Sequence, residues 1–151
     1  MRQIYPPLPA DPTLFGGVIL RRVLALVVDC IVIVILGLAM AVFIAIFGVF
    51  TLGLGWIAFH IIPWLPLFYY TLIIGSSGAT PGQRALGLTV RQDADFSRPT
   101  LTQALVWTLL LWLSFVFACL PFLLALFNPR GRAAHDILSG LTIIKQPQIA
   151  Y

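Results

Sequence analysis

The residues from Val23 to Ile74 form a long apolar stretch, in which the only acidic, basic or histidine side chains are Asp29 and His60. Roughly 20 apolar residues in a helix already cross the hydrocarbon of a bilayer, so this stretch is long enough for two crossings. A soluble chain of this size would have too little polar surface to cover so much apolar area. The sequence therefore predicts an integral membrane protein.

The composition agrees with a membrane environment. Of the 151 residues, 60% are hydrophobic and 9% are charged, whereas about a quarter of the residues in an ordinary soluble domain are charged. The net charge is +4, and the basic residues cluster beside the apolar segments. This arrangement favours contact with the lipid bilayer and with anionic lipid head groups. It does not favour nucleic acid, because the aromatic residues lie inside apolar segments rather than on a basic soluble face.

We expect one membrane domain over residues 17–145, between a proline-rich tail at 1–16 and a short tail at 146–151. The first residues lack the basic start and apolar core of a signal peptide, so the first membrane helix should be retained. The domain divides into three apolar segments, a polar loop and a C-terminal amphipathic segment: 18–47, 57–74 and 101–127, then 75–100 and 128–145.

Glycine and proline positions shape the first two apolar segments. Gly53 and Gly55 interrupt the apolar run and predict a turn between two helices. Pro63 and Pro66 lie inside the second helix, where each removes a backbone N–H donor. We expect them to kink this helix, which a membrane protein tolerates when neighbouring groups bind the freed carbonyls.

Two polar segments share one order of local signals. Thr80-Pro81-Gly82-Gln83 has the spacing of a capping box with proline in the first helical position, which predicts a short interfacial helix. The alternation in Leu88–Arg91 then predicts a half-buried strand. Asn128-Pro129 likewise predicts the start of a short helix, and Leu141–Ile144 a second strand. If these strands pair, both segments lie on one side of the membrane.

The basic residues form three clusters, and the positive-inside rule favours the cytoplasm for each of them. The clusters are Arg21 and Arg22, then Arg84, Arg91 and Arg98, and last Arg130, Arg132 and Lys145. Three full spans cannot satisfy all three. Residues 101–127 therefore either turn back near Ser114–Pro121 as a re-entrant hairpin, which we favour, or span the membrane and leave the last cluster outside. Each limb of such a hairpin would reach only about 18 Å.

These features define an expected fold class. It is an all-α membrane protein, a small polytopic helical bundle with three apolar segments, of which the third is broken or re-entrant in the favoured alternative. Short interfacial helices complete it, together with a two-stranded β pair if the two predicted strands meet.

Asp29 lies within the first apolar segment, seven residues after Arg22. A carboxylate near the bilayer centre costs about 2.5 to 3.5 kcal/mol, so it must be paired, protonated or in contact with water. Seven residues are two helical turns, or roughly 10 Å, which is too far for easy direct contact. We expect Asp136 to pair with Arg22. For Asp29 the candidate partners are Arg84 and Arg132.

Two interpretations of these polar residues remain open. In the first, they form a fixed ion-pair network that sets helix register and transports nothing. In the second, Asp29 exchanges a proton for a monovalent cation such as Na⁺, which requires an acid in a partly dry site that water can reach. Lipid binding and partner recruitment are further alternatives.

Other candidate residues carry weaker signals. His60 and His135 are able to relay protons, although a structural role is more common for an isolated histidine. Gly37, Ala41 and Ala45 form a ridge of small residues suited to close helix packing, either within the chain or across a homodimer. The two cysteines lie in apolar runs, so we expect no disulfide and no metal site. The sequence also lacks a phosphate loop. We expect no cofactor and no enzymatic activity.

The chain resembles the RDD family, which has an arginine before the first membrane helix, an aspartate within it and a second aspartate near the end. Arg22, Asp29 and Asp136 match this signature. Three further motifs support the resemblance: Arg21–Ala25, Gly78–Arg84 with Leu86–Leu88 after it, and His135–Thr142. Together they extend from Gly16 to Lys145.

The resemblance implies a multi-pass protein of the bacterial inner membrane, in a family whose general function is unsettled and of which some members are linked to sodium–proton exchange. Two departures are visible. Gln83 stands where a lysine is common, and Val106-Trp107 replaces a leucine-arginine pair that often begins the third segment. The second departure removes a candidate partner for an acid.

Two functional hypotheses follow. The first is a small, homo-oligomeric membrane protein that exchanges a monovalent cation for protons at Asp29, with Arg22 and Asp136 organising the site. The alternative is a non-transporting scaffold or assembly factor that docks partners through its cytoplasmic polar segments. In both, the N-terminus is expected to be cytoplasmic.

Overall fold

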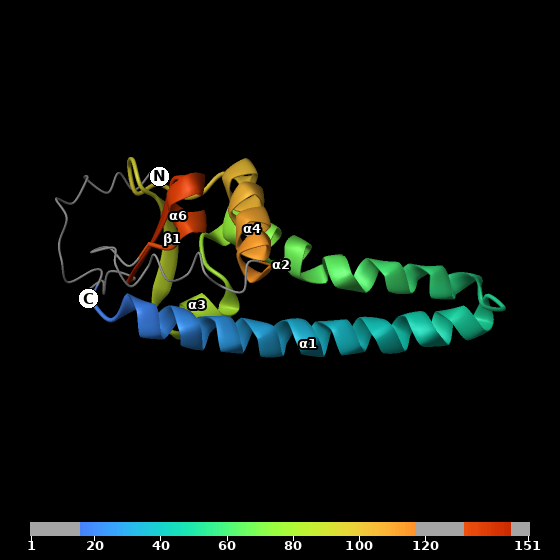
Figure 1. Cartoon of the computed structure of the whole chain (residues 1–151). Helices are drawn as coiled ribbons and strands as arrows, with labels where there is room; N and C mark the ends of the chain where they lie inside the picture. Colours follow the sequence, from blue (N-terminus) through green and yellow to red (C-terminus); the bar gives the residue numbers. More distant parts are fainter. Residues whose placement is uncertain (1–15, 117–131, 146–151) are drawn as a thin grey trace, which may run out of the picture.

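A long helical hairpin extends from a smaller mixed head in the computed structural model, which describes residues 16–116 and 132–145 (Figure 1). The hairpin consists of helix α1 (Val18–Phe50), the 3-10 helix η2 (Leu54–Trp64) and helix α2 (Leu65–Ser77). The remaining elements gather at the open end of the hairpin: α3 (Pro81–Ala85), β1 (Leu88–Gln92), α4 (Leu101–Val116), α6 (Ala134–Ser139) and β2 (Leu141–Lys145).

The hairpin has the dimensions and surface of a membrane element. Two stretches of the described residues, Val18–Phe50 and Leu54–Ser77, are long and apolar enough to cross a bilayer, and little of either is buried inside the protein. The apolar side chains at the tip are the most exposed, with Phe50 at 82% and Leu52 at 96%. A helix that is apolar all round and still exposed has lipid as its natural surroundings.

The return limb of the hairpin differs from the prediction. Instead of one kinked α-helix, the chain forms a 3-10 helix as far as Trp64 and then begins the α-helix α2. Pro63 lies inside the 3-10 helix. Pro66 occupies the first turn of α2, where a missing N–H costs nothing because that group has no partner inside the helix. The chain therefore starts a new helix at this point.

Glycines bring the two limbs of the hairpin together. A Cβ on Gly37 would lie 3.7 Å from a methyl carbon of Leu65, and a Cβ on Gly48 would overlap the ring of Trp56. The Trp56 indole N–H also donates to the carbonyl of Ala45, at 3.4 Å. The Gly37 end of the predicted small-residue ridge therefore packs within the chain.

The two predicted strands pair with each other, although the prediction of a half-buried first strand is wrong, because Leu88–Val90 are all buried. β1 and β2 are antiparallel, with Val90 opposite Ile143, so the two polar segments lie on the same side of the molecule. α4 also begins beside this sheet, where the Gln103 amide donates to the Gln92 side chain at 3.4 Å. The start of α4 and the strand β2 therefore both lie in the head, and the path of the chain between Val116 and Arg132 lies outside the described residues.

The described part of the third apolar segment, helix α4, does not run parallel to the hairpin. The described part of α4 is 16 residues long and runs across the hairpin, packed against α2 (Figure 1). Gly75 permits the contact, since a Cβ there would lie 3.1 Å from the backbone of Leu101. Of the predicted break at Ser114–Pro121, only the part as far as Val116 lies within the described residues.

The predicted start of the second short helix lies outside the described residues, but Arg132, which the prediction placed in that helix, is not helical. Asn128, Pro129 and Arg130 lie outside the described residues, and α6 starts at Ala134. Arg132 therefore precedes the helix and is not part of it. Gly140 ends the helix with a left-handed φ of 68°, as its position before the strand suggests. The buried core joins the first part of α1 to α2, α4 and the sheet: Val18, Ala25, Tyr69, Tyr70, Ile74, Leu88, Val90, Ala104, Trp107, Leu111, Leu141 and Ile143.

Candidate functional site

Asp29 is buried inside the protein, with 1% of its surface exposed. Its carboxylate accepts three hydrogen bonds from groups that come from two other parts of the chain. The Tyr69 hydroxyl of α2 and the Gly82 backbone N–H of α3 both donate to Oδ1, at 2.8 and 2.9 Å. The Thr80 hydroxyl donates to Oδ2 at 2.6 Å. Asp29 thus fastens α2 and α3 to α1.

The predicted capping box of α3 supplies one of these donors. The Thr80 hydroxyl oxygen accepts from the Gln83 N–H at 3.1 Å, and the Gln83 side chain accepts from the Thr80 N–H at 2.9 Å. The hydroxyl proton remains available and is donated to Asp29. The local helix cap and the contact with α1 therefore share one side chain.

Gly82 lets α3 approach α1 closely. A Cβ at this position would lie 2.3 Å from the Ala25 carbonyl oxygen and 2.8 Å from Asp29 Oδ1. Both distances are well below van der Waals contact, and the first involves backbone. The Gly82 N–H consequently reaches the carboxylate only because the residue has no side chain.

The prediction that Arg84 or Arg132 pairs with Asp29 is wrong. Within the described residues, no arginine or lysine forms an ion pair with Asp29. Arg84 is exposed, and Arg132 pairs instead with Asp93, Nη1 to Oδ2, at 3.0 Å. Neutral donors compensate the charge of the Asp29 carboxylate, because hydrogen bonds to the charged form stabilise it without an opposite charge.

The second buried carboxylate, Asp136, has a basic partner. The Arg22 guanidinium donates to Oδ2 and forms an ion pair with it, as the sequence predicted. The Trp107 indole N–H donates to Oδ1 at 2.7 Å, and the Ala133 N–H donates to Oδ2 at 3.0 Å. Three elements therefore meet at Asp136: α1, α4 and the start of α6.

Trp107 stands at a position where the family often has an arginine. Its presence in place of an arginine suggested that an acid had lost a partner. The structure contradicts this interpretation, because the indole N–H bonds directly to Asp136. A neutral donor on α4 thus serves a carboxylate whose charge is already balanced by Arg22.

The surroundings of Asp136 set the protonation of both neighbouring groups. Burial alone would raise the pKa of Asp136, but Arg22, His135 and the Trp107 hydrogen bond together hold that pKa below its usual value. His135 Nε2 lies 3.4 Å from Asp136 Oδ1. Burial lowers the pKa of His135 to about 4, although Asp136 opposes the shift. His135 is therefore neutral at pH 7.

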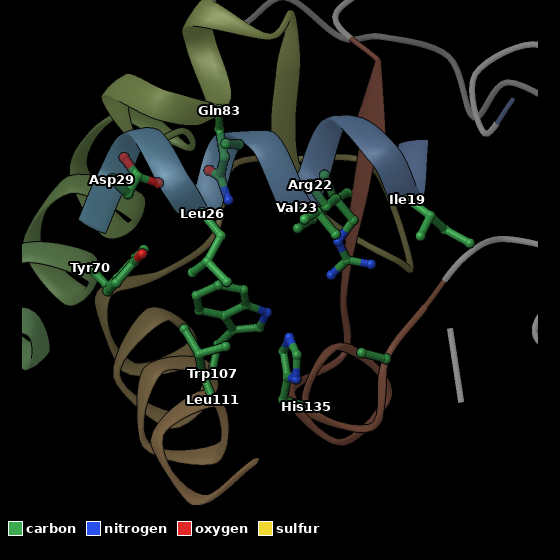
Figure 2. A pocket seen from close by; sticks show the side chains of 13 residues that line it. Ile19, Arg22, Val23, Leu26, Asp29, Tyr70, Gln83, Trp107, Leu111 and His135 are labelled. Atoms are coloured by element: carbon green, nitrogen blue, oxygen red, sulfur yellow. The ribbon is translucent and has the colours of Figure 1, made fainter. Parts of the chain in front are cut away.

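A cavity of about 260 Å³ lies beside Asp29, Arg22 and His135 (Figure 2). Arg22 and Asp29 line it from one face of α1, and Trp107 and His135 line it from the opposite side. Most of the remaining lining is apolar. The full lining is Ile19, Arg22, Val23, Ala25, Leu26, Asp29, Tyr70, Gln83, Trp107, Leu111, Ala133, His135 and Ile143.

The other predicted site residues lie elsewhere. His60 is exposed on η2, where its Nδ1 lies 3.0 Å from the Ile57 carbonyl oxygen, and it does not line the cavity. Cys30 is exposed and free. The described residues include no group of three or more histidine, cysteine or acidic side chains that could hold a metal ion.

Sequence reasoning missed the donors around Asp29 and the aromatic wall of the cavity. Tyr69 and Tyr70 were indistinguishable from other apolar positions of the second segment. Thr80 and Gly82 carried a usable signal, since the capping box was recognised, but nothing in the sequence indicated that it would contact α1.

Together the fold and the site define a membrane protein in which an apolar helical hairpin carries a head built around two buried carboxylates. The sequence model of the RDD family matches residues 17–140, which is most of the chain. The chain therefore belongs to the RDD family. No match was found among curated proteins or among solved structures.

Proposed function

We propose that this chain is a membrane-anchored scaffold of the bacterial inner membrane, in which the buried carboxylates hold the head onto the hairpin and transport nothing. The observation that carries the proposal is the donor set of Asp29, three neutral groups at 2.6 to 2.9 Å. A site that binds and releases a monovalent cation needs oxygen acceptors around the ion. Here three donors occupy most of the lone pairs of the Asp29 carboxylate, which leaves too few free oxygen acceptors to surround a monatomic ion.

The length of the hairpin supports two crossings. Helix α1 continues for about 21 residues beyond Asp29, which at 1.5 Å per residue is about 31 Å. This length matches the hydrocarbon thickness of roughly 30 Å. With the hairpin tip at the far boundary of the bilayer, Asp29 lies at the near boundary. Its burial among protein donors then removes the cost of an acid in lipid.

The distribution of charge supports a cytoplasmic head. The hairpin between Val23 and Ser77 contains no arginine or lysine. The described basic residues all lie in the head or at the end of the hairpin that joins it: Arg21, Arg22, Arg84, Arg91, Arg98, Arg132 and Lys145. By the positive-inside rule, this end and the N-terminus face the cytoplasm. Cysteine labelling near Lys145 from outside intact cells would contradict this orientation.

The exposed basic residues indicate what the head docks. Arg84 and Arg98 are exposed and would meet anionic lipid head groups or an acidic partner protein near the membrane surface. The apolar faces of the hairpin are also available to a second copy of the chain, which would make the scaffold homo-oligomeric.

Cation–proton exchange is the second candidate, and one observation favours it. The cavity reaches Asp29, so an ion or a proton could approach the carboxylate if one of its donors moved away. In this alternative, Arg22 and Asp136 would hold the helices while Asp29 takes up and releases Na⁺ or H⁺.

Proton flux in proteoliposomes separates the two candidates. We expect Na⁺ or K⁺ gradients to drive no proton movement through the parent protein or through Asp29→Asn. Cys30→Ser, at the exposed neighbouring position, is the matched control. The scaffold proposal is wrong if the parent and Cys30→Ser catalyse cation-driven flux and Asp29→Asn abolishes it while remaining folded by size-exclusion chromatography.

A further inference from the structure

The cavity beside Asp29 is larger than a single water molecule or a monatomic ion requires. Its volume of about 260 Å³ is roughly nine times the 30 Å³ that one water occupies in the liquid. Leu26 of α1 and Leu111 of α4 contribute to a mainly apolar wall. A space of this size and lining fits a small organic molecule with an apolar part.

Tyr70 provides independent evidence for a ligand. Only 6% of this residue is exposed, and its hydroxyl has no hydrogen-bond partner among the described residues. Figure 2 shows the hydroxyl end of Tyr70 directed towards the cavity. An unpartnered buried hydroxyl costs about 1 to 3 kcal/mol. A polar group in the cavity would remove this cost.

The charge of the cavity favours a cation. Arginine, aspartate and histidine side chains line it: Arg22, Asp29 and His135. The Arg22 charge is balanced by Asp136 directly behind it, and His135 is neutral when buried. Asp29 therefore supplies the net charge of the wall. Its three donors leave about one of the four lone-pair sites of a carboxylate for a ligand.

The aromatic lining favours an organic cation over a metal ion. Tyr70 and Trp107 line the cavity with ring centroids 6.2 Å apart, and cations bind to aromatic faces. A hard metal ion instead requires several oxygen ligands, whereas the groups bonded to Asp29 are donors. An organic anion would place its charge against Asp29.

We propose that this cavity binds a small primary or secondary alkylammonium ion. The ammonium group lies at the end formed by Asp29 and the Tyr70 hydroxyl, and the alkyl part lies between Leu26, Trp107 and Leu111. The proposal goes beyond the scaffold function and does not depend on it, since a scaffold or an exchanger could carry such a site.

Calorimetric titration of the full chain in an uncharged detergent tests the chemistry of the ligand. The probes are n-butylammonium, n-butanol and n-butyrate, which share an alkyl chain and differ in charge. We expect saturable binding of n-butylammonium and at least roughly tenfold weaker binding of n-butanol, in line with a desolvated cation near a carboxylate and aromatic rings. Binding of n-butyrate should be undetectable.

Two variants test the location without removing Asp29, whose loss could prevent folding. Tyr70→Phe keeps the ring and removes the unpartnered hydroxyl, so affinity for n-butylammonium should fall roughly three- to tenfold while the fold is retained. Leu26→Phe adds volume to the cavity wall and should abolish binding. Leu109→Phe, on the exposed side of α4, is the control and should bind like the parent.

Three results would overturn the proposal. The first is the absence of saturable n-butylammonium binding to the folded parent. The second is equal affinity for n-butanol, which would identify an apolar cavity with no preference for charge. The third is unchanged binding in folded Leu26→Phe, which would place the ligand elsewhere. None of these results depends on whether ion flux is observed in proteoliposomes.

Discussion

Thr80 and Asp29, which are 51 residues apart in the sequence, are joined by a hydrogen bond of 2.6 Å between the threonine hydroxyl and the carboxylate. The same hydroxyl accepts the N–H of Gln83 and caps helix α3. One side chain thus caps the start of α3 and fixes this helix to the membrane hairpin. The stability of the head and its attachment to α1 are therefore coupled.

Replacement of Thr80 should reveal this coupling. Thr80→Val keeps the shape but removes the helix cap and one donor to Asp29, so we expect a loss of about 2 to 4 kcal/mol in unfolding free energy. Thr80→Ser retains the hydroxyl and should lose much less. Unfolding of the detergent-solubilised protein, followed by circular dichroism, measures both. Equal stability of the two variants would show that the hydroxyl contributes little.

Gly82→Ala should be far more damaging than an alanine at another helical glycine. The new Cβ would lie 2.3 Å from the Ala25 carbonyl oxygen, so α3 must move away from α1 and lose its bond to Asp29. We expect a loss of about 3 kcal/mol or more. Gly37→Ala is the control, because its Cβ would make an ordinary 3.7 Å contact with Leu65. That variant should be neutral or slightly stabilised by helix propensity, and the same unfolding measurement compares them.

The ion pair between Arg22 and Asp136 is suited to a double-mutant cycle. Arg22→Met leaves a buried carboxylate without its charge partner, so each single variant, including Asp136→Asn, should lose about 3 to 5 kcal/mol. The double variant removes both charges and should lose clearly less than the two single losses combined. Additive losses would mean that the two groups do not interact in solution. Equilibrium unfolding of all four proteins provides the comparison.

Local signals predicted the local elements well. The capping box at Thr80, the two short strands and the apolar length of the first helix each depend on neighbours in the sequence, and all three are present in the structure. The pairing of Arg22 with Asp136 was also predictable, because an arginine and an aspartate in an apolar chain have few alternatives. Opposite charges can therefore indicate a contact even between residues that are 114 positions apart in the sequence.

Contacts between neutral groups were not predictable in this way. The partners of Asp29 are a tyrosine hydroxyl, a threonine hydroxyl and a backbone N–H, and none of them has a charge that would indicate an acid nearby. Arginines were therefore expected in their place. The 3-10 helix η2 was missed for a related reason, since Pro63 and Pro66 show that a regular α-helix is disturbed but not which geometry replaces it.

Trp107→Phe should separate hydrogen bonding from packing at the second carboxylate. The variant keeps an aromatic ring in the core but removes the N–H that donates to Asp136 at 2.7 Å. We expect a loss of about 1.5 to 3 kcal/mol, the range for a hydrogen bond to a charged group. Trp112→Phe, at a position that is 43% exposed on the same helix, should lose much less. A similar loss in both variants would assign the effect to ring size.

His135 should make the protein less stable in mild acid. Burial lowers its pKa to about 4 in the folded protein, from 6.5 when exposed. Below pH 6.5, His135 binds a proton in the unfolded chain, whereas in the folded protein it binds one only near pH 4. Stability should therefore be full above pH 6.5 and fall by about 3 kcal/mol in total as the pH decreases to 4. Asp136, whose pKa is lowered, remains ionised over this window and adds its own loss only in stronger acid.

Unfolding measured from pH 7 to pH 4 tests whether His135 causes the loss of stability in acid. His135→Gln carries no titratable group, so its stability should change little between pH 6.5 and 4.5. His60→Gln is the matched control, because His60 is exposed on the hairpin and bonds only to a nearby backbone carbonyl among the described groups. It should keep the slope of the parent protein. If His135→Gln retains that slope and His60→Gln loses it, the proton that destabilises the fold binds to the hairpin and not beside Asp136.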